Sequence, residues 1–146
     1  MDKEIEKKIY QIRKTLENFD KSDFDNATTF YHSSGFPKGC CGDTTDLIGL
    51  YLLKFHGIES EYVCGEGLIN NSYQYHAWLL CQGYIIDITA DQFNDIGYNL
   101  PEVLIQVQSD FHDNFDTRTN NPISVEYLKD TNIPSVLSKV VSLMQV

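Results

Sequence analysis

The sequence predicts an α+β fold that forms a single domain over residues 1–146. Two helical patterns occupy the chain up to Gly57, and short segments rich in aromatic and β-branched residues follow from Glu61. The hydrophobic fraction of 42% over 146 residues is enough for one buried core. We therefore expect a central buried helix packed on a small antiparallel sheet, with helices near the two ends of the chain flanking it.

The two helical patterns differ in their apolar surface. In residues 2–19 the apolar positions follow one another at steps of three or four, as on one face of an amphipathic helix, at Ile5, Ile9, Ile12, Leu16 and Phe19. A loop is expected from about 24 to 39. The run from Asp43 to His56 is apolar on nearly every side and stops at Gly57, which predicts the central buried helix.

A β-hairpin is predicted around Gln82-Gly83, which separates the strand candidates Tyr75–Cys81 and Tyr84–Thr89. With that turn, Cys81 pairs with Tyr84, and His76 and Asp87 become diagonal neighbours on one face. Further expectations are strands at Glu61–Gly65 and Val103–Val107, a polar loop over residues 109–121, and a C-terminal helical stretch interrupted at Pro134.

The charge balance excludes several kinds of partner. The chain has 11 Lys and Arg residues and 21 Asp and Glu residues. The resulting net charge of −10 repels nucleic acid and anionic membrane surfaces. No apolar stretch is long enough to span a bilayer, and the charged start lacks the apolar core of a secretory signal. The four cysteines include no C-x-x-C pair. We expect a reduced, cytoplasmic protein, either monomeric or a weak homodimer.

Cys41 is the candidate nucleophile because it lies where a loop containing Gly39 passes into the central helix. The unpaired amides and the dipole at a helix start favour a thiolate, and loop amides can hold an oxyanion. A cysteine nucleophile needs a base and a group that orients the base, and the hairpin offers His76 and Asp87 for these roles.

Structural roles compete with this interpretation. Single cysteines and histidines are more often buried structural residues than catalytic ones. Asp87, between Ile86 and Ile88, is an acid in a buried strand and needs a partner. His112 has no evident partner in the sequence. The cysteine spacings do not suit zinc, and the acidic residues of the 109–121 loop lack EF-hand spacing, so no metal or cofactor is expected.

Four motifs in order resemble the transglutaminase-like superfamily of cysteine enzymes. They are Gly39-Cys40-Cys41-Gly42-Asp43, the apolar helix ending in Gly57-Ile58, His76-Ala77-Trp78 and Asp87-Ile88-Thr89, and with their flanks they place the core at about residues 39–93. The resemblance implies a papain-like fold with a Cys41, His76 and Asp87 triad. The family's pattern assigns the nucleophile to Cys41 rather than Cys40. Two prolines of that pattern are replaced here, by Glu59 and Ile88, which indicates a divergent branch.

The implied activity is acyl transfer through a thioester on Cys41. Hydrolysis of an amide in a protein or peptide, by a peptidase or a glutamine deamidase, is the first expectation, because the chain carries no added barrels or sandwiches. Protein-glutamine transglutamination is one alternative, and a catalytically idle module that binds a partner is the other. Substrate binding or support of the reacting groups is expected from Cys40, Gly39, Trp78 and Gln92.

Overall fold

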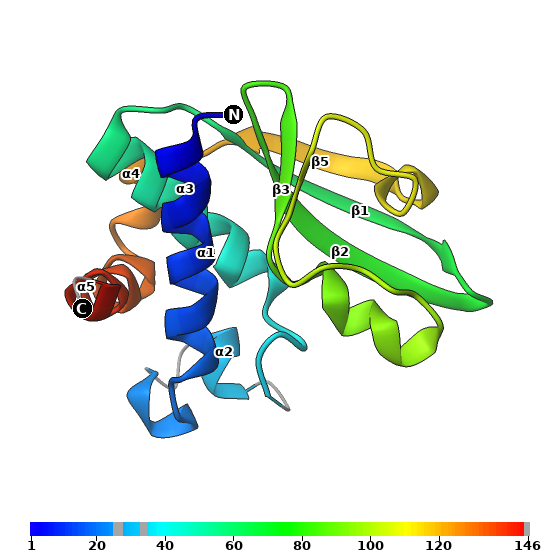
Figure 1. The fold of residues 1–146 in the computed structure, drawn as a ribbon, viewed down its shortest axis with the longest axis horizontal. Helices are drawn as coiled ribbons and strands as arrows, with labels where there is room; N and C mark the ends of the chain where they lie inside the picture. The colour runs from blue at the N-terminus through cyan, green and yellow to red at the C-terminus, as the bar shows by residue number, and fades with distance from the viewer. Residues whose placement is uncertain (25–27, 33–34, 145–146) are drawn as a thin grey trace.

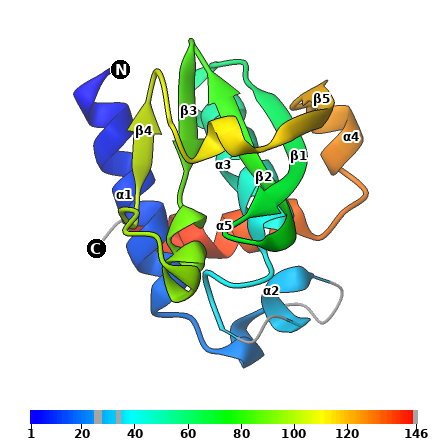
Figure 2. The ribbon, with the colours of Figure 1, turned by 90° about the vertical axis from the view of Figure 1, so that its right-hand side faces the viewer.

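The computed structural model describes residues 1–24, 28–32 and 35–144, and the chain combines an antiparallel sheet with flanking helices (Figure 1). The sheet order is β4-β3-β2-β1-β5, and every neighbouring pair is antiparallel. Figure 2 shows β4 and β5 at the two edges of the sheet, with α3 behind β1 and β2. The strands are β1 (Glu61–Ile69), β2 (Ser72–Cys81), β3 (Tyr84–Asp87), β4 (Leu104–Gln106) and β5 (Asp116–Pro122).

The central helix α3 (Cys41–His56) packs against β1 and β2 on one side and against α5 on another. Its apolar residues supply much of the larger core cluster, in which Leu47 and Leu52 have no exposed surface. Gly57 ends the helix in the left-handed conformation, with φ of 64°, and its amide bonds the Leu53 carbonyl at 3.1 Å. The expected buried helix is therefore present, and it begins two residues earlier than predicted.

Two further helices cover the core near the ends of the chain. In α1 (Lys3–Glu17) four residues of the predicted apolar face are buried, Ile5, Ile9, Ile12 and Leu16, whereas Phe19 lies beyond the end of the helix and is half-buried. The Asp2 side chain accepts hydrogen bonds from the first-turn amides of Glu4 and Ile5. In α5 (Ile133–Met144) Pro134 is the second residue, where a helix needs no amide donor, so the predicted interruption is wrong. The remaining helical segments are η1 (Lys21–Asp23), α2 (Thr29–His32), η2 (Ala90–Ile96), η3 (His112–Asn114) and α4 (Val125–Leu128).

The predicted hairpin register is confirmed, because Cys81 pairs with Tyr84 across Gln82-Gly83. Both turn residues have positive φ, 53° and 81°, as a tight two-residue hairpin requires. The predicted polar loop at 109–121 is wrong. It contains η3 and the edge strand β5, whose side chains are all exposed. The predicted loop at about 24–39 contains α2, and its residues 25–27 and 33–34 lie outside the described residues.

A second, smaller core cluster lies apart from the helical core and is mostly aromatic. It contains Val63, Ile69, Trp78, Ala90, Phe93, Phe111 and Phe115. His76 lies among these rings, with its centroid 5.0 Å from Phe93 and 5.7 Å from Phe115. In the described part of the chain, no helix combines the length and apolarity needed to cross a bilayer.

Candidate active site

The first helical residue of α3 is Cys41, and its side chain is half-buried. Cys40 precedes it as the N-cap, and Gly39 before that has a φ of 71°, which favours glycine. The first amides of a helix have no partner within the helix. Their partial positive charge therefore lies at the N-terminal end of α3, where Cys41 is the first residue. This end of α3 can therefore stabilise a negative charge on sulfur or on a nearby oxyanion.

His76 on β2 and Asp87 at the end of β3 are hydrogen-bonded, with Nε2 of the imidazole 2.6 Å from Oδ2 of the carboxylate. This is the contact that the hairpin register predicts. Both side chains are almost completely buried, at 1% and 3% exposure for the two residues. The pair is thus held in a dry environment, where the interaction between opposite charges is strong.

Asp87 accepts four hydrogen bonds, two on each oxygen. Oδ2 is 2.6 Å from His76 Nε2 and 2.7 Å from His112 Nε2, and Oδ1 accepts from the amide of Thr89 at 2.9 Å and its hydroxyl at 3.2 Å. Burial alone would raise the pKa of Asp87, but the two imidazoles hold it well below its ordinary value. Because an ionised carboxylate only accepts, both Nε2 atoms carry a proton.

His112 is a member of this network that could not be recognised from the sequence, where it has no evident partner. It lies at the start of η3, and its Nδ1 is 2.6 Å from Ser109 Oγ. Ser109 Oγ also accepts the amide of His112 at 3.3 Å, which leaves its own proton free for Nδ1. No spacing in the sequence links His112 to Asp87, which is 25 residues away. The one available signal was a polar His-Asp-Asn turn between Phe111 and Phe115.

The second ring nitrogen of His76 is left for Cys41. Nδ1 is buried and has no hydrogen bond of regular geometry to any described residue. Burial lowers the pKa of His76, but the charge and hydrogen bond of Asp87, together with Cys41, outweigh it and raise this pKa to about 10. The raised pKa favours the doubly protonated imidazolium form of His76 beside Cys41.

Glycines in β1 let the segment that carries His112 lie directly on the sheet. A Cβ on Gly67 would lie 2.3 Å from the Asn114 carbonyl oxygen, and one on Gly65 would lie 2.9 Å from Phe115 Cβ. Trp78 packs edge-on against His112, with ring centroids 4.8 Å apart. Trp78 is 6% exposed, and through its contact with His112 it covers part of the Asp87 network.

The other predicted residues lie near the site in different roles. Cys40 is buried, its Sγ is 3.6 Å from the Pro37 oxygen, and burial raises the pKa of this thiol to about 12. It therefore remains a neutral thiol. Gln92 donates to the Thr89 carbonyl at 3.0 Å, and so supports the segment that follows Asp87. Gly39 shapes the turn before Cys41.

His76, Asp87 and His112 have the residue types of a metal site, and their ligand atoms lie within 4.8 Å of one another. The distances favour hydrogen bonds. Ligands at about 2.1 Å from a tetrahedral metal lie roughly 3.4 Å apart, whereas the two nitrogens here are 2.6 and 2.7 Å from the shared oxygen. We interpret the cluster as a proton-bearing network, in which Asp87 is the acceptor for both imidazoles.

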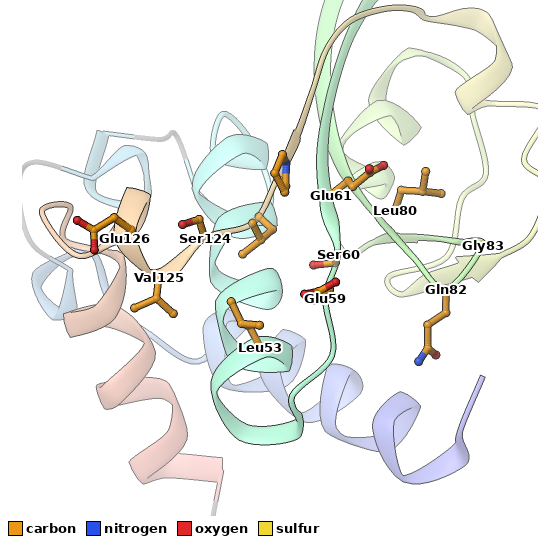
Figure 3. Close-up of a pocket in the computed structure, with 12 residues that line it drawn as sticks. Leu53, Glu59, Ser60, Glu61, Leu80, Gln82, Gly83, Ser124, Val125 and Glu126 are labelled. Atoms are coloured by element: carbon orange, nitrogen blue, oxygen red, sulfur yellow. The ribbon is translucent and has the colours of Figure 1, made fainter.

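Two cavities lie along α3. One of about 780 Å³ is near the C-terminal end of the helix, where Figure 3 shows Leu53 between Ser60, the residue before β1, and Val125 of α4. Leu53 is twelve residues from Cys41, about 18 Å along the helix, so this cavity is remote from the thiol. A second cavity of about 430 Å³ is lined by Asp46, Tyr62, Asn121, Pro122, Ile123 and Tyr127.

Comparisons with protein-family models, curated proteins and solved structures give no match for this chain. The resemblance to transglutaminase-like enzymes therefore depends on the motifs between residues 39 and 93. The fold is a mixed one, with a five-stranded antiparallel sheet and flanking helices.

Proposed function

We propose that the protein is a cysteine-dependent acyl-transfer enzyme that hydrolyses an amide bond in a protein or peptide. Cys41 is the nucleophile, His76 transfers protons and Asp87 holds the imidazole. The proposal includes the fold type, which would be the papain-like core of transglutaminase-like enzymes. The reducing environment of the cytoplasm suits a free thiol in this role.

The reaction begins with the Cys41 thiolate next to the His76 imidazolium. Sγ forms a bond to the acyl carbon, and amides at the start of α3 hold the oxyanion. The C–N bond then breaks, and the leaving amine takes the proton from Nδ1 of His76. Water next attacks the thioester and gives a proton to Nδ1, the C–S bond breaks, and the carboxylic acid leaves. The proton on Nδ1 and the thiolate are thereby restored.

The observation that carries this proposal is that Nδ1 of His76 has the Cys41 thiol beside it and no other hydrogen-bond partner among the described residues. Asp87 occupies Nε2, and every lone-pair direction of Asp87 is used by a hydrogen-bond donor. A purely structural histidine, buried to 1% exposure, would be expected to satisfy its second nitrogen as well. An unsatisfied nitrogen on the side of a half-exposed thiol at a helix start is the arrangement that thiol catalysis needs.

Alkylation by iodoacetamide tests this proposal, with each cysteine followed separately by peptide mass spectrometry. The sulfur forms a bond to the methylene carbon and iodide leaves, so the rate reports the thiolate population. At about pH 6 an ordinary thiol is almost entirely protonated. We expect Cys41 to react at least about tenfold faster than Cys64, which is also half-buried.

The His76→Ala variant should remove this advantage of Cys41 and leave the rate of Cys64 unchanged. Circular dichroism of the variant checks that the fold persists. The proposal would be wrong if Cys41 reacted like an ordinary thiol and His76→Ala changed nothing.

A second experiment distinguishes the possible acyl acceptors. The wild-type protein is incubated with a mixture of glutamine-containing peptides and a primary amine, and the products are identified by mass spectrometry. Cleaved peptides indicate a peptidase, and the mass gain of deamidation indicates a glutamine deamidase. Amine incorporation would instead make the protein a transglutaminase. The Cys41→Ala variant is the control, because it removes the thioester and should give none of these products.

A further inference from the structure

The cavity lined by Asp46 and Tyr62 adjoins the first turn of α3. Gly42 and Asp46 are one helical turn apart on the same face of the helix. A Cβ on Gly42 would lie 3.0 Å from the Tyr62 hydroxyl oxygen, so Tyr62 rests on the residue that follows Cys41. Asp46 lies five residues beyond Cys41, about 7.5 Å along the helix axis. Tyr62 lines the cavity, and the pKa of its hydroxyl is raised by burial together with the nearby Cys41 and Asp46, so it connects the cavity to the thiol.

Asp46 is the one charged group among the described lining residues of this cavity. No lysine, arginine or hydrogen-bond donor is placed against its carboxylate in the described part of the chain, and burial and the charge of Asp43 raise its pKa to about 7. A desolvated carboxylate without a counterion is unfavourable. It therefore gains free energy when a cation enters the cavity.

The aromatic lining suits the same kind of ligand. Tyr62 and the largely exposed Tyr127 present ring surface beside Asp46, and planar or compact cations bind well over such rings. The larger cavity shares Pro122 and Ile123 with this one, and its charged lining residues are Glu59, Glu61 and Glu126. Neither cavity has a lysine or arginine among its described lining residues, so the walls of both cavities are acidic and apolar.

We infer that the cavity between Asp46, Tyr62 and Tyr127 binds the cationic side chain, a guanidinium or an ammonium, of the polypeptide whose acyl carbon reacts at Cys41. This inference depends on the proposed function, because it assigns the substrate of that site. The cavity and the acidic surface beyond it then select a basic polypeptide. The net charge of −10 attracts such a substrate from solution.

Binding to the full-length Cys41→Ala protein tests the inference separately from catalysis. The probes are a blocked hexapeptide amide with one glutamine and one arginine, and the same peptide with citrulline in place of arginine. Citrulline keeps the shape of arginine and removes its charge. We expect the arginine peptide to bind about tenfold more tightly in titration calorimetry, as for a charged hydrogen-bond pair.

Asp46→Asn in the same background should abolish this preference, since asparagine keeps the volume of the side chain and removes its charge. Glu4→Gln, an exposed change of equal charge on α1, is the matched control and should keep the preference. Equal binding of the two peptides by the parent protein would overturn the inference, as would a preference that survives Asp46→Asn. The first of these comparisons needs no variant of Asp46.

Agmatine, a free amine with a guanidinium, tests whether the cation belongs to the acyl acceptor. Incorporation of agmatine into a glutamine peptide, together with displacement of the arginine peptide, would overturn the assignment to the acyl donor. Failure of the proposed function is seen separately, as ordinary alkylation of Cys41 in the wild-type protein.

Discussion

Asp87 is a buried carboxylate whose orientation depends on two histidines. His76 and His112 donate to the same Oδ2 atom, while Thr89 fixes Oδ1. Each donor spreads the negative charge of Asp87 and limits rotation of the carboxylate. Both ring nitrogens of His112 are occupied, by Ser109 and Asp87, so we interpret it as a positioning residue that acts on His76 through Asp87.

Replacement of His112 by alanine tests this role. Loss of a buried donor should lower the free energy of unfolding by about 1–3 kcal/mol. It should also strengthen the pull of Asp87 on His76, so the pKa of His76 should rise further above its ordinary value. The alkaline limb of the pH profile of Cys41 alkylation should then shift to higher pH. A loss of stability alone would not cause this shift. His112→Gln, which restores an N–H donor, should return the profile toward that of the wild type.

Asp46 should make stability depend on pH. Its pKa is about 7 in the folded protein, against 3.8 for an ordinary aspartate. A carboxyl group with a raised pKa holds its proton longer in the folded state, so the folded state loses stability as pH rises from about 4 to about 7. Asp46→Asn should therefore increase the free energy of unfolding at about pH 8, by about 1–2 kcal/mol after allowance for solvent screening.

Urea denaturation at about pH 4 and about pH 8 measures this difference. The gain from Asp46→Asn should be small at the lower pH, where the carboxyl group is protonated in the folded state. Glu4→Gln should give no gain at either pH. An equal gain from Asp46→Asn at both pH values would show that Asp46 does not titrate as argued.

At the scale of elements, α1 is attached to the segment after β3 by one buried cation. Arg13 binds both oxygens of Asp91 at 2.8 Å, and it also donates to Glu17 at 2.6 Å and to the Ile88 carbonyl at 2.6 Å. The Arg13 side chain is 5% exposed and that of Asp91 is 14% exposed. This network holds the chain that follows Asp87, and both carboxylate oxygens of Asp91 are used within it.

Arg13→Met should lower the free energy of unfolding by about 3 kcal/mol, because it leaves Asp91 buried without its partner. Urea denaturation provides the measurement. Arg118→Met is the matched control, since Arg118 pairs with Glu66 at 2.9 Å on the surface and its side chain is 57% exposed. The control should cost less than about 1 kcal/mol. Similar costs for the two variants would contradict the structural role of Arg13.

The sequence predicts some elements well because the signal is local. The Gln82-Gly83 turn determines its own hairpin register, and the apolar run before Gly57 identifies the buried helix. Strand β5 was missed because all of its side chains are exposed and polar, so no alternation of apolar and polar residues indicates a strand. It is an edge strand that depends on pairing with β1, which is information that its own sequence lacks.

For the whole molecule, the difference between local signals and contacts made by tertiary packing decides how much of the candidate site could be predicted. His76 and Asp87 are linked through one hairpin, so their contact followed from the register. Cys41 was linked to them by the chemistry that a thiol nucleophile requires and by resemblance, without a register that predicts the contact, and His112 reaches Asp87 through the packing of η3 on the glycines of β1. Contacts of this second kind come from tertiary packing, which periodicity and turn signals do not report.

The buried His76–Asp87 pair should determine the pH range of maximal stability for the molecule. The pKa of His76 is about 10 in the folded protein against 6.5 ordinarily, so the folded state keeps a proton that the unfolded chain releases above about pH 6.5. Its contribution to stability is complete below 6.5 and is lost as pH rises toward 10. The pKa of Asp87 is lowered, so its contribution is complete above 3.8 and is lost as pH falls below that value.

Stability from this pair should therefore be greatest between about pH 4 and about pH 6.5. Urea denaturation of the Cys41→Ala protein, in which no thiolate beside His76 offsets the extra proton of the imidazolium, should show the free energy of unfolding falling between about pH 7 and about pH 9.5, with a slope of up to about 1.4 kcal/mol per pH unit. His76→Gln should remove most of this slope, since glutamine does not titrate. The wild type is the comparison for the thiol: Asp87, the larger cause of the raised pKa of His76, is present in both proteins, but the proposed thiolate gives up the proton that His76 keeps, so the wild type should show a smaller slope over this range. A slope that persists in His76→Gln would mean that His76 is not held as an imidazolium in the folded protein.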